Sequence, residues 1–384
     1  MQSQNHLKPK AYVADRFGRP RYCATIWIDF LNGHLSSGTL DRYVNAVASI
    51  YRSAESMCPP VDLDMALLEP DLDRVETVLT SYLLVQQSSG NLRHWQLALR
   101  FVTAILEYVV GVDDPVRVQR MRIIRQRFQQ LSVRPRQPGP RIRSLPLSVM
   151  ENLHEIFHPH SDSNPFRSEK YHWRNFVIFL LLTELGLRKG ELLALNCDAV
   201  KHQTDLTTSR SILWINVDNL ASDFDNRSRP ARLKNANSNR ELPISLELAN
   251  ALETYVVNFR GDPPHPFLFN SSEDAPLSAS ALDLMLLSAS DGLSQQSKHD
   301  LSSSRIRKLG AHNLRHTSVL IRLQRFIHGG MEMEDALARL RPFYGWSRQS
   351  TMPFHYARAY FDPKYLDVFD ITFKSHLSIL KEIL

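Results

Sequence analysis

Four segments in the second half of this 384-residue chain hold side chains that could act together on a phosphodiester. Attack on a phosphodiester builds negative charge on the phosphate oxygens, and guanidinium groups bind such oxygens through paired donors. Arg188 and Arg315 could therefore clamp one phosphate. The segments are Gly186–Leu195 (GLRKGELLAL), the stretch around Lys234, His312–Thr317 (HNLRHT) and the stretch from Gly345-Trp346 to His355-Tyr356.

The same segments supply groups that could move protons during such an attack. A tyrosine hydroxyl has an unperturbed pKa of about 10, so Tyr356 needs a positive field and a base to become a nucleophile. Lys234 could protonate the leaving 5′ oxygen, and His312 could accept or relay the tyrosine proton. The sequence near these segments has no carboxylate cluster suited to metal ions, which favours phosphoryl transfer without a metal or other cofactor.

Simpler interpretations exist for the individual residues. Arg188 could lie on a helix surface, and Trp346 could be a core aromatic residue. Arg232 or Arg240 could serve in place of Lys234.

The two histidines of the HNLRHT segment have an alternative of their own. His312 and His316 are four residues apart on one helical face and could bind zinc. Asn313, however, stands where an HExxH metalloprotease helix has its glutamate, and the sequence offers no evident third ligand.

Taken together, the four segments resemble the catalytic motifs of the tyrosine recombinases, which include phage integrases and chromosome-dimer resolvases. GLRKGELLAL is similar to the family's first arginine box, and HNLRHT to its His-x-x-Arg-His box. LKNANSNRELPIS resembles the lysine hairpin, and YGWSRQSTMPFHYARAY resembles the segment that carries the nucleophile. Order and rough spacing agree over about residues 144–365, well over half of the chain.

The resemblance implies a role for each matching residue. Arg188 and Arg315 would hold the scissile phosphate, Lys234 would be the general acid, and His312 would assist proton transfer. Tyr356 would form a 3′-phosphotyrosyl bond that stores the energy of the broken strand, so that rejoining needs no ATP.

Further residues would support this set. Glu191 would brace the Arg188 helix, and His316 would support the site. Trp346 stands where most members have histidine and some have tryptophan, and would pack on the nucleophile or donate its indole N–H to the phosphate. The interval from Trp346 to Tyr356 is one residue longer than the frequent spacing, which leaves Tyr360 as a competing nucleophile.

The first 130 residues have a helical pattern, and the family resemblance implies that they form a core-DNA-binding domain. Apolar residues recur at helical spacing in Ser36–Ser56, Asp71–Gln87 and Asn91–Val110, and Val116–Gln129 predicts a short arginine-rich helix. Residues 131–146 predict a basic linker, because proline and glycine interrupt regular structure there.

Arginines are concentrated around this linker. No acidic residue occurs from Pro115 to Arg143, and we expect the arginines to follow the phosphate backbone of DNA rather than form a merely solvated face. They are Arg117, Arg120, Arg122, Arg125, Arg127, Arg134, Arg136, Arg141 and Arg143.

Residues 147–384 predict a catalytic domain that is mainly α with a small β-sheet, an α+β fold. Ser148 followed by Glu151 is a capping-box pattern for a helix to about Phe157. Ser211–Val217 has strand composition, and the turn-rich residues 235–239 predict a hairpin between Arg232–Lys234 and Glu241–Ile244. Helices are expected at Trp173–Leu185, Arg188–Leu195, Leu246–Asn258, Ala279–Ser290 and His312–His328, with a tail helix in Phe361–Leu384 that packs on its own domain or on a neighbouring protomer.

Bulk properties agree with a nucleic-acid partner. The net charge is +6 and the sequence pI about 9.2, a mild basic excess that favours a polyanion. Three scattered cysteines suit a reducing compartment. We find no signal-peptide pattern, and the longest apolar run, Phe176–Leu182, is too short to span a membrane. These features predict a soluble cytoplasmic protein.

The leading hypothesis is a site-specific recombinase of a mobile element, which forms a tetramer on double-stranded DNA with a specific recombination site. A type IB topoisomerase, which relaxes supercoils as a monomer, would share the chemistry. A non-catalytic DNA-binding protein of the same fold is the alternative from another class.

Overall fold

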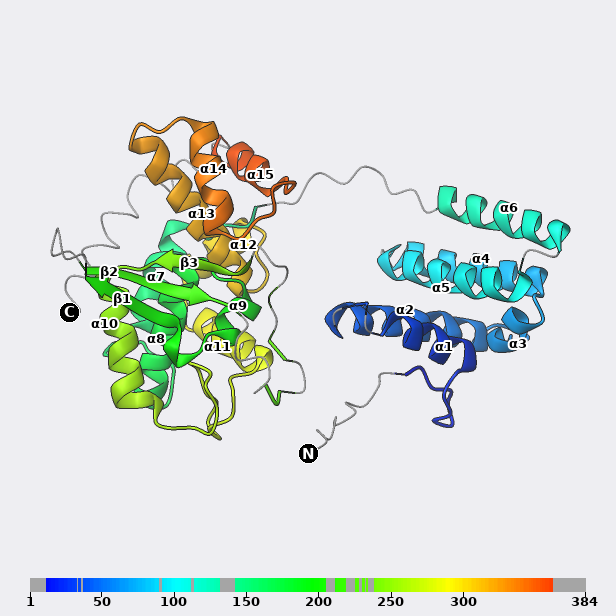
Figure 1. Ribbon diagram of the computed structural model, residues 1–384, viewed down its shortest axis with the longest axis horizontal. Coiled ribbons are helices and arrows are strands. Elements are labelled where there is room, and N and C mark those ends of the chain that lie inside the picture. The colour runs from blue at the N-terminus through cyan, green and yellow to red at the C-terminus, as the bar shows by residue number, and fades with distance from the viewer. Residues whose placement is uncertain are drawn as a thin grey trace. The chain divides into compact units, whose positions relative to one another are not determined.

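The computed structural model describes residues 12–361, apart from residues 33, 36, 90–91, 112–113, 132–141, 205–210, 219–224, 228–229, 232 and 234–237. The chain divides into two compact units, Met1–Gln137 and Pro138–Leu384 (Figure 1).

The first unit is helical throughout its regular structure. Asp62 and Asp71 begin two of its helices, because each carboxylate accepts a hydrogen bond from a backbone N–H in the first turn, those of Met65 and Arg74. Trp95 and Phe128 lie in its aromatic core, with ring centroids 5.6 Å apart. The described helices are α1 (Tyr22–Leu31), α2 (Ser37–Glu55), α3 (Leu63–Leu68), α4 (Leu72–Ser88), α5 (Leu92–Val110) and α6 (Pro115–Leu131).

The second unit combines helices with an antiparallel sheet in the order β1-β2-β3. The strands are β1 (Val200–Thr204), β2 (Ser211–Val217) and β3 (Arg240–Pro243). The helices are α7 (Leu147–Phe157), α8 (Glu169–Glu184), α9 (Lys189–Ala194), α10 (Leu246–Thr254), α11 (Ala279–Asp291), α12 (Gln295–Ser303), α13 (Ala311–His328), α14 (Met333–Phe343) and α15 (Met352–Tyr360). A 3₁₀ turn spans Cys197–Ala199, and a π-helical turn, Tyr255–Arg260, continues α10.

This architecture confirms the predicted fold class, a helical region followed by a mainly α unit with a small sheet. The strand β3 pairs with β2, Val217 opposite Arg240 and Trp214 opposite Pro243. Arg232 and Lys234, the other arm of the predicted hairpin, lie outside the described residues, and so does the tail from residue 362 onward.

The described residues of the second unit form two hydrophobic core clusters. The larger one joins the apolar helix α8 to the buried sheet residues Ile215, Val217 and Leu242. The smaller one lies among α13, α14 and α15 and contains Trp346 and Tyr356. The segments with the catalytic motifs connect these clusters, so packing of both fixes their positions.

The start of α7 differs from its sequence prediction. The helix begins at Leu147, Pro146 is at its N-cap position, and Ser148 lies in the first turn. The capping-box prediction for Ser148 is therefore wrong, because its hydroxyl instead donates to Asp300 Oδ2 of α12 at 2.5 Å. Just before the helix, Leu145 is buried and its backbone N–H donates to Thr317 Oγ1 at 2.8 Å.

None of the helices that the structure describes combines the length and apolar character needed to cross a bilayer.

Candidate active site

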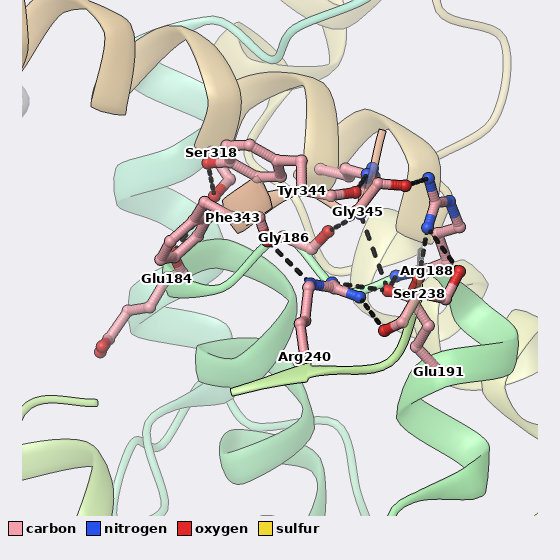
Figure 2. Close-up of polar contacts among 11 residues, drawn as sticks. Glu184, Gly186, Arg188, Glu191, Ser238, Arg240, Ser318, Phe343, Tyr344 and Gly345 are labelled. Atoms are coloured by element: carbon pink, nitrogen blue, oxygen red, sulfur yellow. Dashed lines mark hydrogen bonds and ion pairs between the residues drawn. The ribbon is translucent and has the colours of Figure 1, made fainter. Parts of the chain in front are cut away.

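One buried carboxylate, Glu191 of α9, joins three arginines from separate parts of the chain. It forms ion pairs with Arg188, with Arg240 at 3.0 Å and with Arg315 at 3.8 Å. Figure 2 shows Arg188 and Arg240 converging on Glu191. Burial raises the pKa of Glu191, but Arg240, Arg188 and Arg315 outweigh it and lower that pKa to about 2. The carboxylate is therefore ionised and holds the cations together.

Arg188 is fixed at the beginning of α9. Its backbone N–H donates to Glu191 Oε2 at 2.8 Å. Its guanidinium donates through Nη1 to Ser238 Oγ at 3.2 Å and through Nη2 to the carbonyl oxygen of Gly345 at 2.9 Å. The side chain is 20% exposed, so part of it can reach a ligand.

Arg315 of α13 lies deeper than Arg188. It donates through Nη1 to the carbonyl oxygen of Gly186 at 2.6 Å and through Nη2 to that of Tyr344 at 2.5 Å. Burial, followed by repulsion from Arg188, lowers the pKa of Arg315 to about 10. That value leaves the guanidinium charged near neutral pH.

An open pocket of about 450 Å³ brings these motifs to one surface. Arg188, Arg315 and His312 line it, together with Lys189 and Asp283. Lys189 Nζ lies 2.6 and 2.7 Å from the two carboxylate oxygens of Asp283 on α11. The two arginines predicted to bind phosphate therefore share one concave surface with a predicted proton-transfer residue.

Arg240 connects three segments of the second unit through hydrogen bonds that the sequence did not predict. It donates through Nε to the carbonyl oxygen of Phe343 at 2.8 Å and through Nη1 to that of Ser238 at 2.7 Å (Figure 2). With its Glu191 ion pair, it ties β3 to α9 and to the end of α14. Lys234, for which Arg240 was an alternative, lies outside the described residues.

Two glycines allow the arginines to reach backbone acceptors. Gly186 and Gly345 have φ values of +58° and +59°, a region that side chains other than hydrogen disfavour. Their carbonyl oxygens accept from Arg315 and Arg188, respectively. Tyr344 is next to Gly345, and its hydroxyl forms a hydrogen bond of 2.9 Å with the hydroxyl of Ser318 (Figure 2).

Tyr356 is buried on α15, with 1% of its surface exposed. Its ring stacks on Trp346 with a centroid distance of 5.3 Å, and Trp346 stacks in turn on Tyr344 at 5.4 Å. The longer interval between Trp346 and Tyr356 thus still brings their rings together. Burial raises the pKa of Tyr356, while Arg315 and Arg188 act in the opposite direction.

Tyr356 and Tyr360, the two candidate nucleophiles, differ in their surroundings. Tyr356 lies in the electrostatic field of both Arg315 and Arg188, which act to lower its pKa. The Tyr360 ring packs edge-on against Phe361 with a centroid distance of 5.4 Å.

The two histidines of α13 differ in their surroundings. His312 is exposed at the pocket, whereas His316 is buried with Nδ1 2.5 Å from the Tyr356 hydroxyl. Their ring centroids lie 4.2 Å apart. Over the described ranges, no three His, Cys, Asp or Glu side chains gather in a way that could hold a metal ion. The sequence did not predict the direct contact between His316 and Tyr356.

Four of the five arginines of α6 have acidic partners from neighbouring segments, and the fifth, Arg122, is exposed. Arg117 pairs with Asp114, Arg120 with Asp73, Arg125 with Glu107 and Arg127 with Glu76. The absence of acidic residues from Pro115 to Arg143 thus does not leave these four arginines without acidic partners, because Asp73, Glu76 and Glu107 come from α4 and α5. Such exposed pairs are weak, of the order of 1 kcal/mol or less, so the arginines can exchange them for phosphates.

The remaining arginines of the predicted DNA-binding set fall on or near the linker. Arg134, Arg136 and Arg141 lie outside the described residues. Arg143 is exposed in the second unit, and its carbonyl oxygen accepts from Asn313 Nδ2 at 3.0 Å. This bond places Arg143 beside the start of α13 rather than in the first unit.

Comparison with known proteins gives one family. Residues 149–361, more than half of the chain, match the model of the phage integrase family. No curated protein matches.

Among solved structures, the XerA recombinase is 17% identical, with a TM-score of 0.38 and coverage of 92% of this chain and 96% of that one. XerH bound to its difH substrate is 13% identical, with a TM-score of 0.49 and coverage of 90% and 87%. A lambda integrase dimer bound to a COC′ core site is 14% identical, with a TM-score of 0.41 and coverage of 86% and 75%.

Proposed function

Because this chain belongs to the phage integrase family, that of the tyrosine recombinases, we propose that it cleaves and rejoins DNA through a covalent bond between Tyr356 and a 3′ phosphate. The family match over residues 149–361 confirms the family that the sequence motifs indicated. The observation that carries the residue assignment is the convergence of Arg188 and Arg315 on Glu191, with Tyr356 in the field of both arginines.

In this proposal the arginines bind the non-bridging oxygens of the scissile phosphate. Their guanidinium groups are already oriented by backbone carbonyls and by Glu191, so little reorganisation is needed when negative charge develops. Trp346 holds the ring of Tyr356, and Lys234 protonates the leaving 5′ oxygen. His312, at the pocket surface, assists proton transfer.

The biological role that we propose is site-specific recombination for integration, excision or resolution of a mobile element. The chain would assemble as a tetramer on two copies of a double-stranded recombination site. The phosphotyrosyl ester keeps the energy of the broken strand, so the cycle needs no cofactor.

Covalent capture tests the proposal and does not require that the DNA site be known. The full chain is incubated with a pool of nicked duplexes whose central sequence is random, and DNA attached to protein is recovered under denaturing conditions and sequenced. We expect adducts with the parent chain and with Tyr360→Phe, and none with Tyr356→Phe. An adduct formed by Tyr356→Phe would overturn the assignment.

The captured sequences separate the enzyme classes. A shared inverted repeat is expected for a site-specific recombinase. Capture without sequence preference, together with relaxation of supercoiled plasmid, would instead identify a type IB topoisomerase. Sequence-specific binding with no adduct would identify a non-catalytic DNA-binding protein.

A further inference from the structure

His316 lies in direct contact with the atom that would attack DNA. Its Nδ1 is 2.5 Å from the Tyr356 hydroxyl, and both side chains are buried, with exposed fractions of 5% and 1%. The two residues come from different helices, α13 and α15, whose packing is fixed by the cluster around Trp346. The contact is therefore built into the fold of the second unit.

The direction of this hydrogen bond follows from the charge state of His316. Burial, then the charges of His312, Arg315 and Arg143, lower the pKa of His316 to about 3. The imidazole is thus neutral near pH 7, Nδ1 accepts from the tyrosine hydroxyl, and Nε2 carries the ring proton. A neutral nitrogen facing the hydroxyl is the arrangement that a proton acceptor requires.

Charged and titratable groups from several elements act on this pair. Arg315 and His312 share α13 with His316, Arg188 begins α9, Tyr344 follows α14, and Arg143 precedes α7. Burial, together with these charges, makes His316 a weak base in the resting protein. Negative charge that builds on a phosphate bound by Arg188 and Arg315 offsets those cations and strengthens the base as attack proceeds.

We propose that His316, through Nδ1, accepts the proton of the Tyr356 hydroxyl as the tyrosine oxygen attacks the phosphate. The O–H bond of Tyr356 breaks, the bond between its oxygen and phosphorus forms, and the bond from phosphorus to the 5′ oxygen breaks. That 5′ oxygen takes its proton from a different acid. Rejoining runs the transfer backwards, with His316 returning the proton to Tyr356. This inference rests on the proposed function and assigns to His316 a step that sequence resemblance suggested for His312.

The rate of adduct formation on the nicked duplex most enriched by the parent chain tests the inference. His316→Asn keeps a polar atom near the position of Nδ1 but cannot take up a proton near neutral pH. We expect it to slow adduct formation roughly 100- to 1,000-fold. Its rate should rise about tenfold per pH unit between about pH 6 and pH 9, because hydroxide must then remove the proton, while the parent rate rises less steeply.

Two further measurements separate proton acceptance from other roles. Imidazole added to His316→Gly should restore adduct formation. The slow rate of His316→Asn should persist on a duplex with a 5′-bridging sulfur, because that sulfur leaves without protonation. His299→Asn, an exposed histidine on α12, is the matched control with unchanged rates. DNA binding measured for each variant establishes that the chain is folded.

Each contrary outcome has a distinct meaning. A parent-like rate in His316→Asn, or a slow rate with the parent pH profile, would overturn the role of His316 while leaving the proposed function intact. Recovery of His316→Asn on the sulfur-bridged duplex would make His316 an acid for the leaving group instead. A parent chain that forms no adduct would overturn both the proposed function and this inference.

Discussion

The backbone of Gly186 lies directly against the ring of Tyr344. A Cβ atom at Gly186 would be 2.6 Å from Tyr344 Cε1 and 3.0 Å from Ser318 Oγ. The carbonyl oxygens of both Gly186 and Tyr344 bind Arg315. This close approach therefore sets the position of the Arg315 guanidinium, for which we propose phosphate binding.

We predict that Gly186→Ala lowers the free energy of unfolding and slows adduct formation. A positive φ and a displaced tyrosine ring should together cost about 1–3 kcal/mol. Urea denaturation measures the first effect and covalent capture the second. Gly330→Ala is the control, because Gly330 has a φ of +82° but nothing near its missing Cβ. Equal rates of adduct formation in both variants would show that the contact with Tyr344 has no role in the site.

Glu191 should make stability depend on pH in the acid range. Its pKa is lowered from 4.5 to about 2, so its contribution to stability is fully present above about pH 4.5 and is lost as pH falls toward 2. We predict that Glu191→Gln lacks this component. At neutral pH the variant should be less stable by about 3–5 kcal/mol, because three guanidinium groups lose their counter-charge.

Urea denaturation of Glu191→Gln at several pH values checks this prediction. Glu241→Gln is the control, since Glu241 is an exposed carboxylate on β3. If Glu191→Gln followed the parent curve below pH 4.5, the carboxylate would not hold the arginines as described.

Glu184 should have the opposite effect to Glu191 on the pH dependence of stability. Glu184 lies at the end of α8. Burial and then Glu247 raise its pKa to about 7, although the Ser245 hydroxyl, Arg322 and Arg325 lower it. The native state then binds the proton more tightly than the unfolded chain, so stability falls as pH rises from about 4.5 to 7.

We predict that Glu184→Gln flattens this fall and is more stable than the parent chain at pH 8. The gain should be roughly 1–3 kcal/mol, since each pKa unit is worth about 1.4 kcal/mol. Thermal or urea denaturation across this pH range tests it, with the exposed Glu253→Gln of α10 as control. A variant less stable than the parent chain at pH 8 would contradict the prediction.

The α6 arginines should contribute to the salt dependence of DNA binding. Replacing Arg120 and Arg127 with glutamine should lower the slope of log K against log salt by about 0.9 for each phosphate that the protein no longer neutralises. Asp73→Asn and Glu76→Gln should have the opposite effect on affinity, because they release the same arginines from their carboxylate partners. An unchanged slope in the arginine variant, measured by fluorescence anisotropy, would exclude phosphate binding by these residues.

Local patterns predicted several of the helices and the order of the chemical groups in this chain. Helical spacing of apolar residues predicted α2, α4 and α5, and motif order predicted that Arg188 and Arg315 lie close together. Periodicity and motif spacing are properties of neighbouring residues, so both can be read from one segment.

Partners that come from distant segments were not predictable in this way. The Arg120 and Arg127 ion pairs cross from α6 to α4, and Ser148 meets Asp300 on α12. The contact between His316 and Tyr356 depends on how α13 packs against α15, which no local pattern encodes. Lys234 stays a prediction because it lies outside the described residues.

The Glu191 carboxylate, which pairs with three arginines, affects how tightly the site should bind ligands of different charge. Three guanidinium groups and one carboxylate carry a formal charge of +2. A phosphodiester brings −1 and leaves one positive charge in excess. The five-coordinate species formed when a tyrosinate oxygen adds carries −2, which balances the cluster. Under the proposed function, a vanadate ester that mimics that species should bind more tightly than the diester itself, because its charge matches that of the cluster.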